Sequence, residues 1–100
     1  MAEEHVPSEE ELRAALDSIG VNDVLVNAAT AVVSLGFRRV SEEARDLDET
    51  RRSIEALRAL EPVLREGGAD ESLVRDLEQA RMNLQLAYAK AVGEGATAQD

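Results

Sequence analysis

A run of uncharged residues, VLVNAATAVVSLG at positions 24–36, limits what this chain can fold into, because 32% of the whole sequence is charged. Its polar residues Asn27, Thr30 and Ser34 recur at spacings of three and four, so they share one narrow stripe of a helix. Apolar side chains cover most of the remaining circumference. A helix that is apolar nearly all round needs neighbours nearly all round. We therefore expect this stretch to form a buried helix.

The bounds of this helix follow from its flanking residues. Asn22 can cap it and Gly36 can end it, which predicts a helix at residues 23–35. At about 1.5 Å per residue it would be roughly 20 Å long, against about 30 Å for the hydrocarbon core of a bilayer. We expect the stretch to be buried against protein and not to span a membrane.

The composition favours an all-α fold. A chain of 100 residues suits one domain with one modest core, and only Phe37 and Tyr88 are aromatic. Strands favour aromatic and β-branched residues, whereas this chain is rich in alanine and leucine. We expect a small bundle of three main helices plus a short N-terminal helix.

The short helix is predicted to follow Ser8 and to end near Ile19. Ser8 and Glu11 have the spacing of a capping box, and Gly20 can provide a left-handed stop. The apolar stripe of this helix consists of Leu12, Leu16 and Ile19.

The third helix is predicted to begin at Asp46, which repeats the capping box with Glu49, and to run to about residue 65 or 66. Pro62 lies inside this pattern and removes one backbone hydrogen bond, so we expect a kink or an early end near Leu60.

The last helix carries the strongest periodic signal. Gly67-Gly68 breaks the chain, and Asp70 can cap a helix that frays after Val92. Its heptad seam consists of Leu73, Leu77, Ala80, Leu84, Ala87 and Ala91. The expected organisation is a disordered acidic arm at residues 1–7, a single helical domain at 8–93 and a flexible tail at 94–100.

Charge and cysteine content exclude some functions. The net charge of −10 would repel nucleic acid and anionic membranes, so we expect neither as a partner. The chain has no cysteine, which excludes disulfides and thiolate metal sites. The N-terminal MAEEHVPSEEE lacks the features of a secretory signal, and we expect a cytoplasmic protein.

No pattern of catalytic, metal-binding or phosphate-binding residues is present. The only histidine, His5, falls in the predicted arm without companions. The acids around Asp46 have local uses in capping and in helical ion pairs such as Asp48 with Arg52. We expect no enzyme activity, no cofactor, no metal and no small-molecule substrate.

The apolar helix is the candidate interaction surface. Three amphipathic helices, one of them short, offer limited area to surround it, so we expect a homodimer or a partner protein to cover the rest. The alternative is that it is the central helix of a monomeric bundle. The expected interaction surface consists of Val24, Leu25, Ala28, Val32, Leu35, Arg38 and Arg39.

A second function is left open by Arg38 and Arg39, which follow the apolar helix. Arginine suits phosphate or carboxylate groups, so a ribosome-associated or RNA-associated accessory factor could use this pair. No aromatic residue lies among the arginines for base stacking, which favours an acidic protein patch.

Three segments in order, VLVNAATAVVSLGF, DLDETRRSIEAL and LVRDLEQARMNLQLAYAKA, resemble a small bacterial family known as domain of unknown function eighteen-forty-four. The resemblance covers roughly residues 22–92 and rests on Leu35-Gly36, on Asp46-Leu47 with residues 54–57, and on the approximate counterpart at 83–88. The chain departs from the family at 64–70, where many relatives have a basic loop.

The resemblance implies a small, soluble, helical bacterial protein with no established activity and no agreed catalytic residues, so it transfers no site. In one bacterial branch, relatives tend to be encoded next to a translation initiation factor, which is an associational hint toward ribosome-linked work.

Overall fold

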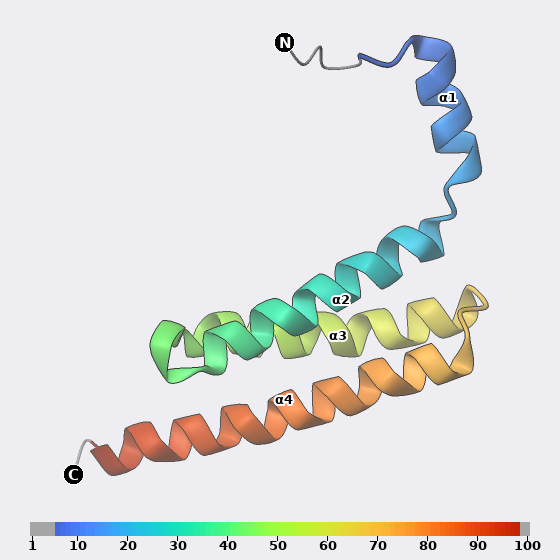
Figure 1. Cartoon of the computed structure of the whole chain (residues 1–100). Coiled ribbons are helices and arrows are strands. Elements are labelled where there is room, and N and C mark those ends of the chain that lie inside the picture. Colours follow the sequence, from blue (N-terminus) through green and yellow to red (C-terminus); the bar gives the residue numbers. More distant parts are fainter. Residues whose placement is uncertain (1–5, 99–100) are drawn as a thin grey trace.

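The computed structural model describes the backbone of residues 6–98 and the side chains of residues 6–95. This part of the chain is all-α and contains no strand, as the composition predicts. Its four helices are α1 (Glu9–Ser18), α2 (Val21–Val40), α3 (Leu47–Glu66) and α4 (Glu71–Ala98), and the short 3-10 helix η1 (Glu42–Ala44) lies between α2 and α3 (Figure 1).

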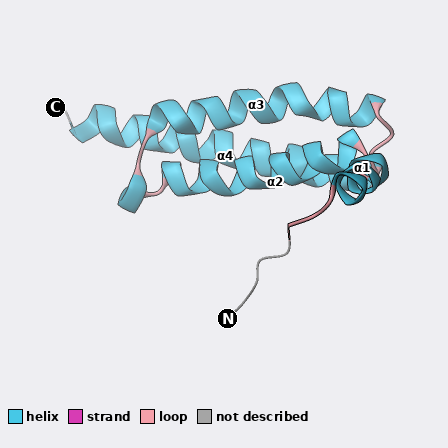
Figure 2. Ribbon diagram, turned by 90° about the horizontal axis from the view of Figure 1, so that it is seen from above, coloured by secondary structure: helices cyan, strands magenta, loops and turns pink. Residues whose placement is uncertain are grey.

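The helices fall into two parts. α2, α3 and α4 lie side by side and each contacts the other two, whereas α1 contacts none of the other helices in the described part of the chain (Figures 1 and 2). Only Ile19 and Gly20 separate α1 from α2, and the two helices are bent by 80°. α1 therefore projects from the end of the packed helices.

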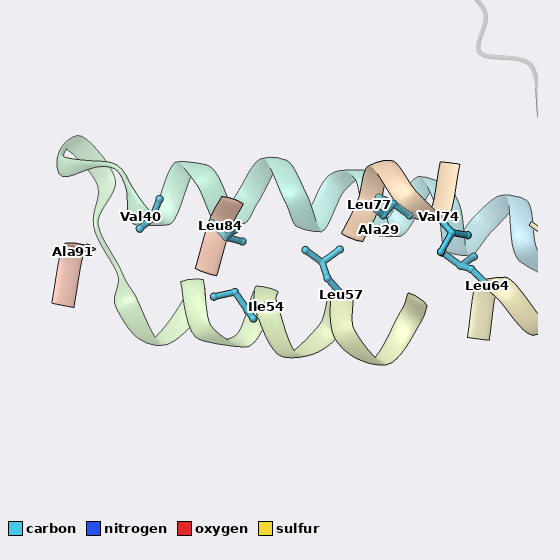
Figure 3. Close-up of a cluster of buried hydrophobic side chains, with 9 residues drawn as sticks. All are labelled: Ala29, Val40, Ile54, Leu57, Leu64, Val74, Leu77, Leu84 and Ala91. Atoms are coloured by element: carbon cyan, nitrogen blue, oxygen red, sulfur yellow. The ribbon is translucent and has the colours of Figure 1, made fainter. Parts of the chain in front are cut away.

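One aliphatic core joins α2, α3 and α4, and Figure 3 shows its nine buried residues: Ala29, Val40, Ile54, Leu57, Leu64, Val74, Leu77, Leu84 and Ala91. Thr50 is also fully buried in this region. Its hydroxyl donates to the carbonyl oxygen of Asp46 at 2.9 Å, so the polar group has a partner away from water.

The predicted caps of α1 and α3 are confirmed. The Ser8 hydroxyl oxygen accepts a hydrogen bond from the Glu11 amide at 3.2 Å, and the Asp46 carboxylate accepts one from the Glu49 amide at 3.1 Å. Of the predicted kink or early end near Leu60, the early end is wrong, because α3 continues as a helix through Pro62 to Glu66, and the kink stays a prediction. Pro62 is exposed, and the carbonyl one turn earlier, which loses its amide partner, can bond to water.

The predicted end of the apolar helix at Gly36 is wrong, because α2 runs on to Val40. Gly36 is buried inside the helix, where an added Cβ would lie 2.5 Å from Cδ2 of Leu84 and 3.1 Å from Cβ of Ser53. Glycine is needed here for the close approach of α2 to its neighbours and not for a turn. Arg38 and Arg39 therefore lie in the last turn of α2 and not beyond its end.

The start of α2 also differs from the prediction. Gly20 is its N-cap, with φ of −84°, and so provides no left-handed stop for α1. Asn22 lies within the helix, and its side-chain amide donates to the carbonyl oxygen of Leu64 at 3.3 Å. The predicted break at Gly67-Gly68 is confirmed, since α3 ends there and Gly68 has φ of +84°.

α4 extends beyond the prediction. The seam residues Leu77, Leu84 and Ala91 are buried, but the fully buried Val74 was not expected. The helix continues past Val92 to Ala98, and Arg45 pairs with Glu94 at 3.3 Å, where a flexible tail was expected to begin. The predicted arm at residues 1–7 lies outside the described residues up to His5, as do residues 99 and 100 of the predicted tail.

Candidate interaction surface

The outer side of α2 remains uncovered. Val24 and Leu35 are 53% and 57% exposed, and Ala28 lies exposed between them. These three residues follow spacings of four and seven, so they form one line along the helix. Within the single chain, the buried side of this helix consists of Ala29, Gly36 and Val40, so α3 and α4 do not cover it nearly all round, and cover by a second copy or a partner stays a prediction.

The other predicted surface residues are divided between two environments. Leu25 and Val32 are half-buried and pack against the core, so they contribute more to folding than to an outer surface. Arg38 and Arg39 are exposed at the end of α2. The polar residues Asn27, Thr30 and Ser34 are exposed on the neighbouring stripe, where the sequence pattern places them.

A shallow groove of about 230 Å³ lies beside this line, between α2 and α3. Its lining consists of Val32, Leu35, Glu49, Arg52, Ser53 and Ala56. The hydrogen bond from Asn22 to Leu64 joins the start of α2 to the end of α3, so the two helices are antiparallel, and Val63, next to Leu64, is 48% exposed. We call Val24, Ala28, Leu35, Ala56 and Val63 together the α2/α3 face.

Sequence reasoning missed the part of this face that belongs to α3. The stripe of Ala56, Ala59 and Val63, in which Ala56 is half-buried and the other two are exposed, has helical spacing, but the larger stripe of Ile54, Leu57 and Leu64 dominates the same segment. Only the packing of α3 against α2 shows that Ala56 of the smaller stripe lies at the groove with Val32 and Leu35.

Arginines border the α2/α3 face at one end. Arg38 pairs with Glu43 at 3.4 Å. Arg39 and Arg52 make no ion pair within the described residues, and Arg52 lies on the groove beside Glu49. The face is therefore apolar along its length and has unpaired positive charge at its rim.

A second uncovered apolar stripe lies on α1 and its C-cap residue Ile19. Leu12, Leu16 and Ile19 are 49%, 70% and 51% exposed, and α1 contacts no other helix in the described chain. The short helix therefore does not supply the cover for α2 that a compact arrangement would require.

The ion pairs between long helices lie on a different side, between α3 and α4. The Arg81 guanidinium donates to the Glu61 carboxylate at 2.6 Å, and this hydrogen bond raises the pKa of Arg81. Arg65 pairs with Glu71 and Glu78, and its hydrogen bond lowers the pKa of the Glu78 carboxyl below its ordinary value. A carboxyl shifted in that direction stays ionised at neutral pH, so it is suited to holding α3 and α4 together.

The described part of the chain was also compared with the requirements of a metal site and of a membrane-spanning helix. No group of three metal-ligating side chains occurs there, and His5 lies outside it. No single described helix is long and apolar enough to cross a membrane, and α1 with α2 meets that test only as a pair bent by 80°.

Comparison with known proteins gives no relative: the chain matches no protein-family model, no curated protein and no solved structure. The resemblance to the bacterial family of unknown function stays a prediction.

Proposed function

We propose that this protein is a protein-protein interaction or assembly module, and not an enzyme, that self-associates through the α2/α3 face. The observation that carries the proposal is the exposed line of Val24, Ala28 and Leu35 on a helix whose opposite side is in the core. Burying apolar surface is favourable by roughly 25 cal/mol per Å², so two such faces gain from being covered.

We also propose that α2, α3 and α4 form a three-helix bundle, with α1 as a separate arm. The pairwise contacts of the three helices and their shared core support this arrangement. In the bundle, the groove between α2 and α3 is smaller than the roughly 300 to 1,000 Å³ of typical ligand pockets, which favours a binding surface for protein over one for a small molecule.

Sedimentation equilibrium over a wide concentration range tests the proposed self-association. We expect a dimer for the unchanged chain and a folded monomer for Leu35→Asp, because Leu35 is 57% exposed and its replacement leaves the core intact. Ser34→Asp is the matched control, since it adds the same charge one residue away on the exposed polar stripe. A monomeric unchanged chain at every concentration, or equal dimerisation of both variants, would contradict the proposal.

The alternative is a ribosome-associated or RNA-associated factor that uses Arg38 and Arg39. The exposure of Arg39 without an ion pair in the described chain supports it. Binding to RNA should then weaken steeply with salt and disappear when both arginines are changed to Glu. Association that is insensitive to salt favours the apolar face instead.

A further inference from the structure

α1 contacts no other helix in the described part of the chain. It has ten residues, and its apolar stripe of Leu12 and Leu16, continued by Ile19 at the C-cap, is about half exposed or more. Isolated helices shorter than about 12 to 15 residues are marginal in water, so α1 gains stability if this stripe is covered.

The connection to α2 holds α1 away from the α2/α3 face of the same chain. Ile19 has φ of −92° and ψ of 124°, and Gly20 has φ of −84° and ψ of 143°, so both residues are extended. With the 80° bend between the helices, α1 points out from the bundle (Figure 1). In this conformation the stripe is accessible to another molecule.

The charges of α1 complement those at the rim of the α2/α3 face. α1 carries Glu9, Glu10, Glu11 and Asp17 against the single base Arg13. The rim of the face carries Arg39 and Arg52, which lack ion pairs within the described chain, beside Glu49 and the ion pair of Arg38 with Glu43. Opposite potentials favour this pairing.

We propose that α1 of one copy docks on the α2/α3 face of a second copy, and that the second copy returns the same contact. This inference rests on the proposed self-association and names what covers the face. Reciprocal exchange of one element is a low-cost route to a closed dimer, and each copy then buries both of its uncovered apolar stripes.

The first test compares Leu16→Asp with Ala14→Asp by sedimentation equilibrium in the full-length chain. Both changes place an aspartate in α1, but Leu16 lies in the apolar stripe and Ala14 on the opposite side. We expect Leu16→Asp to weaken dimerisation about 30-fold or more, as loss of a central apolar anchor does, and Ala14→Asp to leave it nearly unchanged. Circular dichroism checks that α2, α3 and α4 stay helical in both.

The outcomes separate this inference from the function on which it rests. A dimer that Leu35→Asp dissociates and Leu16→Asp does not would overturn the exchange and keep the self-association. A monomeric unchanged chain would overturn both.

The second test finds which copy α1 contacts. Isotope-labelled and unlabelled chains are mixed, and nuclear Overhauser contacts between copies are recorded. We expect contacts from the methyl groups of Leu16 to those of Val24 or Leu35 on the other copy. Contacts of α1 with its own chain, or none between α1 and the face, would overturn the proposed exchange.

Discussion

Replacing Gly36 by alanine should destabilise the protein, although the same change stabilises most helices. The added Cβ would lie 2.5 Å from Cδ2 of Leu84 and 3.1 Å from Cβ of Ser53. Leu84 is fully buried, so its methyl group has no open space into which to move. Overpacking costs about 1 to 3 kcal/mol, and alanine in place of glycine contributes about 1 kcal/mol to a helix interior. We therefore expect a net loss of about 1 kcal/mol.

Urea denaturation followed by circular dichroism measures this loss, at one fixed protein concentration because association would shift the midpoint. Gly93→Ala is the matched control, since Gly93 also lies inside a helix and its added Cβ would meet no atom within 4 Å. The control should gain about 0.5 to 1 kcal/mol. If Gly36→Ala gains as much as Gly93→Ala, the close approach of α2 to Leu84 is refuted.

Two further predictions concern the contacts between α3 and α4. Arg81→Met should lower the free energy of unfolding, measured by urea denaturation, by about 2 kcal/mol, because it leaves the buried Glu61 carboxylate unpaired. Adding Glu61→Met to this variant should recover part of that loss. If the double variant recovers no stability, the ion pair between Arg81 and Glu61 is contradicted. The pKa of Glu78 is lowered by Arg65, so its contribution to stability is present above the ordinary value of 4.5 and is lost as the pH falls through the lower folded value. The midpoint of thermal unfolding should therefore fall less on acidification for Glu78→Gln than for the unchanged chain. If both proteins show the same dependence of this midpoint on pH, the pairing of Glu78 with Arg65 is contradicted.

Local features of the fold could be predicted from the sequence. A helix cap is formed by two residues three positions apart, so it can be predicted from a short stretch of sequence. Ser8 with Glu11 and Asp46 with Glu49 are two such caps. The end of α3 at Gly67-Gly68 can also be predicted from neighbouring residues alone, because Gly68 adopts the left-handed conformation that ends the helix.

Gly36 shows where local reasoning fails. A glycine after an apolar run predicts a helix end, but the same residue permits close packing when a bulky side chain faces it. Leu84 and Ser53, which face Gly36, are distant in sequence, so no pattern around Gly36 distinguishes the two roles. The position of Arg38 and Arg39, inside α2 and not beyond it, follows from the same long-range contact.

The exposure of the α2/α3 face is also a consequence of that packing. The inner side of α2 presents small residues, Ala29 and Gly36, to α3 and α4, and this allows a close approach. The larger side chains of Val24 and Leu35 then remain on the outer side.

Among the described residues, charged contacts hold α3 to α4 but do not hold α2 to either helix. α3 and α4 are held by Arg81 with Glu61 and by Arg65 with Glu78, and such pairs fix the register of two helices. In the described chain, no charged residue of α2 pairs with α3 or α4, and α2 is held by apolar packing and by the Asn22 hydrogen bond. Because apolar contact has no preferred direction, α2 is free to bind apolar surface on its outer side as well as its inner side. The uncharged run of the sequence therefore faces both the core and the surface that we propose is covered by a second copy.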